Sequence, residues 1–232
     1  MLVSLSLAAG ALVQGAAAAP GSAPHDRLVD IEFADGDPPL GDGGPARWVQ
    51  HRVEFTGTLH VWTSSDLDLF LRAEDGECEL LGEDDDGGGG NTPYLELAVD
   101  AGRALSIAVA AAGPGERGPL VLHLVASPET EATRTAADAA RALLQDAQAL
   151  ARGGNPEGAR ELCVRALAKL GGTERSHVEA EAAWEIGLTA FEMGAVATCR
   201  GALEIARAHR ERVLPPTHPE LCLLYTSPSP RD

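Results

Sequence analysis

The stretch 147–167, AQALARGGNPEGARELCVRAL, returns in altered form 40 residues later as 187–207, GLTAFEMGAVATCRGALEIAR. Small, apolar or glycine residues fall at matching places in the two stretches: Ala147 and Gly187, Leu150 and Ala190, Gly154 and Gly194, Ala159 and Cys199, Cys163 and Leu203, and Ala166 and Ala206. Stacked helical repeats need small residues where helices approach, larger apolar residues where they interlock, and glycine in the turn. The pattern therefore predicts one supersecondary unit present twice.

Each copy has the periodicity of two helices. Two apolar stripes at helical spacing occur in the first copy, namely Leu143, Leu144, Ala147 and Leu150, then Ala159, Leu162, Cys163, Ala166, Leu167 and Leu170. The turn GGNPEG separates them, with Asn155 as the predicted N-cap and Pro156 at the first helical position. Two helices joined by so short a turn form an αα-hairpin.

This half of the chain resembles the tetratricopeptide repeat, whose small-residue positions match Ala147, Ala159 and Ala166, then Gly187, Cys199 and Ala206. Trp184 is displaced by one residue from the usual aromatic position, and Ala190 replaces a larger residue. The period exceeds the usual length of about 34 residues, and RERVLPPTHPEL is similar to the link of kinesin-light-chain-type repeats. The resemblance implies a concave face that binds a protein or peptide, and a third hairpin that begins near Glu220.

In the first half of the chain, apolar residues recur instead at every second position. Apolar residues alternate with polar ones at Val49, Val53 and Phe55, Leu59 and Val61, Leu67, Leu69 and Leu71, Leu95, Leu97 and Val99, and Leu105, Ile107 and Val109. This is the pattern of half-buried strands. Turn-forming stretches such as AEDGE, DDDGGGGNTP and GPGERGP separate the runs. Short strands at this spacing predict an antiparallel β-sandwich.

The same region, DLDLFLRAEDGECELLGEDDDGGGGNTPYLELAVDAGRALSIAVAA, is similar to the bacterial pre-peptidase C-terminal domain. The resemblance covers about residues 45–125 and rests on Asp66, Asp68, Leu69 and Leu71, Gly76, Asp85-Asp86-Gly87, and Ala101-Gly102. It implies a jelly-roll-like sandwich of the kind found on secreted proteins. Ala104 departs from the pattern, because the family often has an aromatic residue there.

Composition changes near Ser127 and Pro128, which predicts a domain boundary. Residues 20–127 hold 20 acidic and 6 basic residues, a balance of −14, whereas residues 128–221 hold 14 and 11, a balance of −3. The formal net charge of −17 argues against a nucleic-acid partner. The predicted fold class is a multidomain β and α protein, with a jelly-roll-like sandwich at 45–127 and a tetratricopeptide-like helical repeat at 128–221.

Residues 1–19 are apolar and end in small residues, as in a secretory signal peptide, although no Lys or Arg precedes Arg27. An uncleaved membrane anchor is the competing interpretation, and only then would the membrane be a partner. Residues 20–44 are expected to be a flexible linker. The predicted location is the periplasm or the exterior.

The final residues 222–232, CLLYTSPSPRD, differ from the rest of the chain in composition. Written back into codons, they match the adapter of a transposon-based sequencing library. We expect this tail to be non-native, with the native frame cut at Leu221.

One metal site is a candidate from the sequence. Asp84, Asp86 and Asn91, with Glu83 and Asp85, offer oxygen ligands of the kind that Ca²⁺ takes on a flexible loop. Their spacing is not that of an EF-hand, so a solvated turn is the alternative. No other cofactor is expected.

No catalytic constellation is predicted. Cys78, Cys163 and Cys199 have neither disulfide nor zinc spacing, and Cys163 and Cys199 occupy helix-packing positions. His51, His60 and His123 are interpreted as ordinary strand residues, and His177, His209 and His218 lack the context of a catalytic base.

Three functions remain open from the sequence. The favoured one is an exported interaction scaffold whose repeats bind a protein or peptide, without catalysis. The order of its parts is also similar to the front of bacterial proteins that end in a CHAT domain, a caspase-like peptidase fold. In that case the catalytic residues lie beyond Leu221. The third is a sugar- or surface-binding sandwich with accessory helices.

Overall fold

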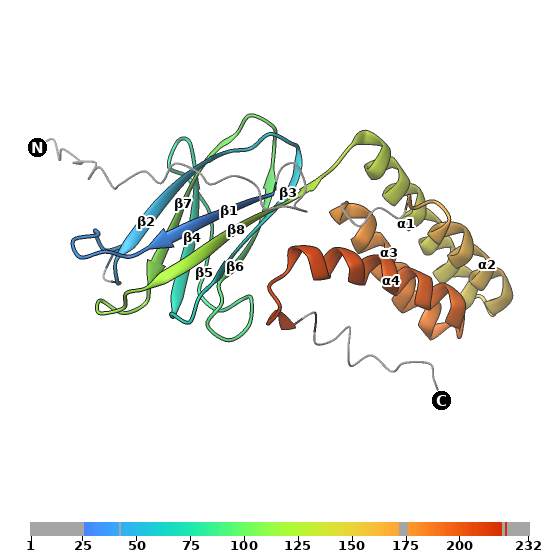
Figure 1. Ribbon diagram of the computed structural model, residues 1–232. Helices are drawn as coiled ribbons and strands as arrows, with labels where there is room; N and C mark the ends of the chain where they lie inside the picture. The colour runs from blue at the N-terminus through green and yellow to red at the C-terminus, as the bar shows by residue number, and fades with distance from the viewer. Residues whose placement is uncertain (1–25, 42, 172–175, 220, 222–232) are drawn as a thin grey trace, which may run out of the picture. The chain divides into compact units, whose positions relative to one another are not determined.

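The computed structural model describes residues 26–41, 43–171, 176–219 and 221 (Figure 1). Two compact units are present, each described by itself: residues 1–54 with 59–125, and residues 55–58 with 126–232. The predicted signal segment 1–19 and the predicted adapter tail 222–232 lie outside the described residues. The chain therefore combines β-sheets and α-helices in separate units.

The first unit contains two four-stranded antiparallel sheets. One sheet has the order β1-β8-β3-β6 and the other β2-β7-β4-β5. The strands are β1 (Arg27–Glu32), β2 (Ala46–Arg52), β3 (Gly57–Ser64), β4 (Leu69–Asp75), β5 (Leu80–Asp84), β6 (Tyr94–Val99), β7 (Ala104–Ala111) and β8 (Pro119–Pro128). The prediction of an antiparallel β-sheet unit is confirmed.

Alternation of side chains explains how these strands form a core. Leu59, Val61 and Thr63 are buried along β3, whereas Ser64 at its end is exposed. Leu95, Leu97 and Val99 repeat the pattern on β6 with exposed Glu96 and Ala98 between them. Because successive side chains of a strand point to opposite faces, each sheet gives one apolar face to the core.

Residues 20–44 include a strand, which corrects the expectation of a linker throughout. β1 pairs with β8 in an antiparallel register that runs from Arg27 opposite Leu124 to Glu32 opposite Pro119. Val29 and Ile31 are buried on one face of β1, with Asp30 and Glu32 exposed on the other. Two inward residues are a weak local signal, and the partner that makes this segment a strand lies 87 to 97 residues away in the chain.

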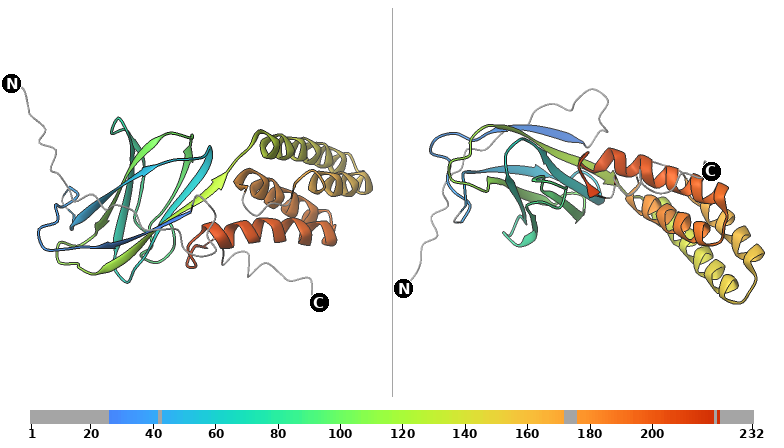
Figure 2. Two further views of the ribbon diagram at one scale, coloured as in Figure 1. Left: turned by 45° about the horizontal axis from the view of Figure 1, so that its top comes forward. Right: turned by 90° about the horizontal axis from the view of Figure 1, so that it is seen from below.

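The second unit contains four described helices, α1 (Glu131–Arg152), α2 (Pro156–Leu167), α3 (His177–Glu192) and α4 (Val196–Val213). Figure 2 shows them as two antiparallel pairs. Thr130 caps α1 in a capping box with Thr133, and the Ser176 hydroxyl accepts a hydrogen bond from Glu179 N at the start of α3. None of the described helices is long and apolar enough to cross a membrane.

Local turn chemistry makes the two pairs alike. Asn155 caps α2 and Pro156 is its first residue, as the sequence predicts. Gly154 has φ +82° and Gly194 has φ +69°, left-handed values that favour glycine. Asn155 N donates to Leu150 O at 2.9 Å, and Ala195 N donates to Ala190 O at 2.8 Å. The same turn therefore recurs after 40 residues.

Small residues let the helices approach closely. Ala147, Ala159, Cys163 and Ala166 of the first hairpin are fully buried, as are Ala190, Ala202 and Ala206 of the second. A Cβ on Gly187 would lie 2.7 Å from Leu203 Cδ2, so any side chain at this crossing requires Leu203 to shift. The first hairpin has Ala147 and Cys163 at the equivalent positions. In the second hairpin the smallest residue, Gly187, thus meets the large Leu203, whereas in the first hairpin the two positions hold the mid-sized Ala147 and Cys163.

A third hairpin was expected to begin near Glu220. Pro219 and Leu221 are helical, and Glu220 lies outside the described residues. The hairpin itself remains a prediction.

Candidate functional site

The outward faces of α1 and α3 form the best-defined polar surface of the helical unit. Three positions of α1 and their equivalents 40 residues later in α3 lie at spacings i, i+4 and i+11, which place them on one face of each helix. We call this set the α1–α3 surface: Arg141, Gln145 and Arg152 with Glu181, Glu185 and Glu192. Each position is exposed or half-exposed. The repeat thus places two arginines on α1, which we call the basic strip, beside three glutamates on α3, which we call the acidic strip.

Two side-chain contacts join the two helices. Arg141 Nε lies 3.3 Å from Glu185 Oε1, and Gln148 Nε2 donates to Thr189 Oγ1 at 3.4 Å. The Arg141 and Glu185 side chains are 34% and 44% exposed, so their ion pair is a weak, partly hydrated one. These contacts fix the register of the strips without removing their charges from solvent.

The acidic strip is held from the other side by α4. Arg210 Nη2 lies 3.2 Å from Glu181 Oε1, and the Arg210 guanidinium carbon lies 4.4 Å from the centre of the Trp184 ring. The Arg210 side chain is only 9% exposed. Cation–π contact and ion pairing together orient Glu181 on the surface. Trp184 therefore has a packing role against Arg210.

The cysteines of the helical unit have the environment of packing residues. Cys163 and Cys199 are buried, and burial raises the pKa of both thiols. Cys163 Sγ lies 3.9 Å from Met193 Sδ. A nucleophilic cysteine needs a setting that stabilises thiolate, and these settings do the opposite. This agrees with the interpretation of both residues as small hydrophobes.

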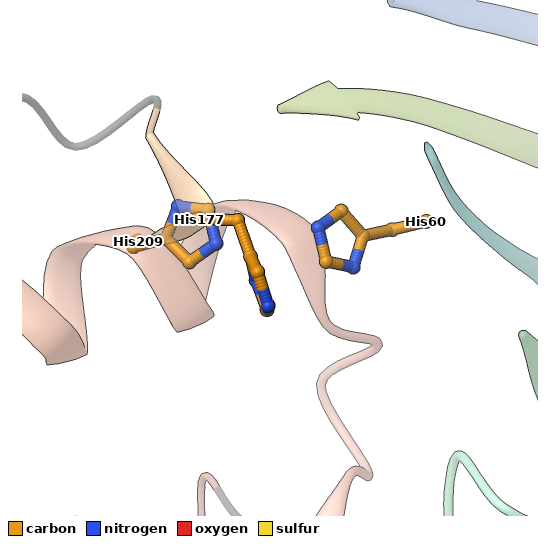
Figure 3. Close-up of side chains that lie close together, drawn as sticks. All are labelled: His60, His177 and His209. Atoms are coloured by element: carbon orange, nitrogen blue, oxygen red, sulfur yellow. The ribbon is translucent and has the colours of Figure 1, made fainter. Parts of the chain in front are cut away.

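Two histidines of the helical unit lie together. His177 at the start of α3 and His209 of α4 lie close together (Figure 3). Their ring centroids are 5.6 Å apart and their ring planes are inclined at 58°. His209 is buried. Tilted rings at this distance pack as an aromatic pair, so the structure gives these side chains a packing role between α3 and α4.

The candidate calcium ligands lie at the end of β5 and in the loop that follows it. Carboxylate oxygens of Asp84, Asp85 and Asp86 lie within 4.8 Å of one another, and Asp86 and Asn91 are exposed. Asp84 Oδ2 accepts hydrogen bonds from Gly87 N at 2.7 Å and Tyr94 N at 2.8 Å. One of the predicted ligand oxygens therefore braces its own loop. Calcium binding stays a prediction. The alternative, a solvated turn, is supported by the hydrogen bonds that Asp84 accepts within the loop.

A cluster on the first unit was missed by the sequence analysis, which treated its histidine as an ordinary strand residue. His123 of β8 stacks on Trp62 of β3, with ring centroids 3.5 Å apart and planes at 6°. His123 Nε2 and Ser64 Oγ share a hydrogen bond of 2.7 Å. Burial lowers the pKa of His123 to about 4. Trp62 and Ser64 alternate on one face of β3, which is the only local signal of the cluster.

The His123 pKa predicts a pH-dependent stability of the sandwich. The unfolded chain takes up a proton at His123 near pH 6.5, whereas the folded chain takes it up only near pH 4. The unfolded state thus binds more protons in this window, and stability should fall as the pH drops from about 6.5 to 4, by about 1 to 2 kcal/mol after allowance for partial exposure. Urea unfolding of the wild type at several pH values measures the slope.

The control for this prediction is His123→Gln, which removes the titrating group. His51, whose pKa is lowered by burial and then by Arg27, against an opposing effect of Glu54, still titrates in the variant. The variant should therefore keep a shallower slope. An identical slope in wild type and variant would contradict the assignment to His123.

Comparison with known proteins shows likeness of structure only. No family model matches the chain, and no curated protein matches it. Among solved structures, the chain is similar to PliG, a periplasmic lysozyme inhibitor of g-type lysozyme from Aeromonas hydrophila, with 19% identity, 49% of this chain and 92% of that chain covered, and a TM-score of 0.34. It is also similar to the pre-peptidase C-terminal domain of a collagenase from Bacillus anthracis, with 9% identity, 43% and 87% covered, and a TM-score of 0.30.

Proposed function

We propose that the chain is an exported interaction scaffold, with a β-sandwich assigned to residues 45–127 plus β1 and tetratricopeptide-like repeats at 128–221 that bind a protein or peptide. The observation that carries the proposal is the α1–α3 surface, where the repeat brings a basic strip beside an acidic strip. Helical hairpins stacked in one register present such strips as one continuous surface.

The charges of this surface indicate the chemistry of the partner. Glu185 and Glu192 on α3 favour cationic side chains, while Arg152 on α1 favours a carboxylate. Exposed charge pairs each contribute a few tenths of a kcal/mol to about 1 kcal/mol. A peptide that carries both signs in the right order therefore gains specificity more than affinity, and binding should weaken as salt rises.

A peptide array of varied charge order, followed by fluorescence anisotropy, tests the proposal. We expect the double variant Glu185→Gln/Glu192→Gln to bind its best cationic peptide about tenfold more weakly, because two exposed charge pairs together contribute about 1.4 kcal/mol. The matched control is Glu157→Gln/Glu204→Gln, which removes two exposed charges from α2 and α4. Equal losses in both variants, or binding to no peptide of the array, would refute the proposal.

A further inference from the structure

The first hairpin contacts the second through a definite set of groups. Gln148 Nε2 donates to Thr189 Oγ1 at 3.4 Å, and Arg160 Nε donates to the Met193 carbonyl at 2.9 Å. Leu167 Cδ2 lies 3.4 Å from the place that a Cβ on Gly201 would take. Together with the Arg141–Glu185 ion pair, these contacts define the interface between the hairpins.

The second hairpin has residues equivalent to those through which the first hairpin contacts it. Forty residues after Gln148, Arg160 and Leu167 are Leu188, Arg200 and Arg207, all of them exposed. Leu188 is 47% exposed, and Phe191, one helical turn further along α3, is 62% exposed. We call Leu188, Phe191, Arg200 and Arg207 the open face. Leu188 stands at the position equivalent to Gln148 of the internal interface, and the exposed Phe191 extends the apolar surface beside it, which indicates a surface that receives another helix pair.

The repeat also shows which surface would fit the open face. Forty residues before Thr189, Met193 and Gly201 are Ala149, Gly153 and Glu161, again all exposed. We call these the receiving face. In the second hairpin the equivalent positions are covered by the first hairpin. Within the described residues, the second hairpin thus exposes one side of the hairpin interface, the open face. The first hairpin exposes the other side, the receiving face.

The residues of the open face and of the receiving face that would meet are chemically compatible. Leu188 would meet Ala149, an apolar contact in place of the Gln148–Thr189 hydrogen bond. Arg200 would meet the Gly153 carbonyl, as Arg160 meets that of Met193. Arg207 would meet Glu161, a pair of opposite charges. None of the three pairs places like charges together or leaves a lone charge against an apolar group, which are the arrangements that oppose association.

We propose that the chain associates with a second copy of itself head to tail, the open face of one copy packing on the receiving face of the next by the same operation that relates its two hairpins. The occupant is a second copy because the receiving face is present on this chain and continues an interface that the chain already forms. Such an interface is heterologous, so association can continue beyond two copies. The proposal rests on the hairpin contacts and not on the peptide-binding function.

Sedimentation equilibrium of the full chain, without peptide, tests this association. The weight-average mass of the wild type should rise with concentration above that of one copy. Leu188→Asp/Phe191→Asp disables the open face, and Ala149→Arg disables the receiving face, so each variant alone should remain at the mass of one copy. Leu80→Asp is the matched control, because Leu80 on β5 is 49% exposed and belongs to neither face; it should associate like the wild type.

A mixture of the two face variants is the decisive sample. One copy still has a receiving face and the other an open face, so the mixture should form heterodimers and stop there. Failure of the mixture to dimerise, or association of either face variant alone, would overturn the head-to-tail arrangement. A wild type that stays at one copy at every concentration would also overturn it. If the open-face variant then melted at a lower temperature than the wild type, another segment of the same chain would be the occupant.

Discussion

Gly187→Leu is expected to lower the free energy of unfolding of the helical unit by about 3 kcal/mol. A Cβ at this position would already lie 2.7 Å from Leu203 Cδ2 and 3.0 Å from Leu203 Cγ. A leucine adds three further carbon atoms to a crossing where Ala202 Cβ is also within 3.7 Å of that Cβ. The helices α3 and α4 must then separate, which weakens the packing of both. Urea unfolding followed by far-ultraviolet circular dichroism measures the loss.

The matched control for this substitution is Ala197→Leu. Ala197 is an exposed residue of α4, so the added side chain meets solvent rather than another helix. Its effect should stay within about 0.5 kcal/mol. A loss of similar size in the two variants would show that the crossing at Gly187 is not the tight contact that the structure indicates.

Leu71→Ala is expected to lower the free energy of unfolding of the sandwich by about 3 kcal/mol. Leu71 is fully buried on β4, where it lies opposite Asp84 of β5 and Val109 of β7. Truncation loses the transfer free energy of the removed carbons and leaves a cavity that the paired strands cannot close. Tryptophan fluorescence during urea unfolding follows this unit through Trp48 and Trp62.

The control is Leu80→Ala on the neighbouring strand β5. Leu80 is 49% exposed, so the same change of residue removes little buried surface. We expect a loss of less than about 0.5 kcal/mol. If Leu80→Ala cost as much as Leu71→Ala, the assignment of inward and outward faces in this sheet would be wrong.

The helical half could be predicted closely from the sequence because its signals are local. The N-cap Asn155, the first-turn Pro156 and the turn glycines Gly154 and Gly194 lie within a few residues of the backbone groups that they satisfy. The offset of 40 residues then fixed the equivalence of the two hairpins. Burial of Cys163 and Cys199 followed from their places in the repeat.

Most strands of the sandwich could be predicted from the sequence, but the side-chain cluster around His123 could not. Alternation identified β2, β3, β4, β6 and β7, since period two is visible in a short window. β1 was taken for linker because its pairing with β8 joins residues far apart in the chain. The same limit hid the stack of His123 on Trp62 and its hydrogen bond with Ser64, which needs β3 and β8 to be neighbours.

The sequence by itself determined the helices, the strands β2, β3, β4, β6 and β7, the hairpin turns and the uneven distribution of charge, because these depend on neighbouring residues. Only the tertiary structure decided which charges lie side by side on α1 and α3, and that Asp84 braces its own loop. Only the tertiary structure, likewise, left Leu188 and Phe191 exposed on α3. The physical reason is that exposure and pairing are properties of packed surfaces, which residues distant in the chain create together.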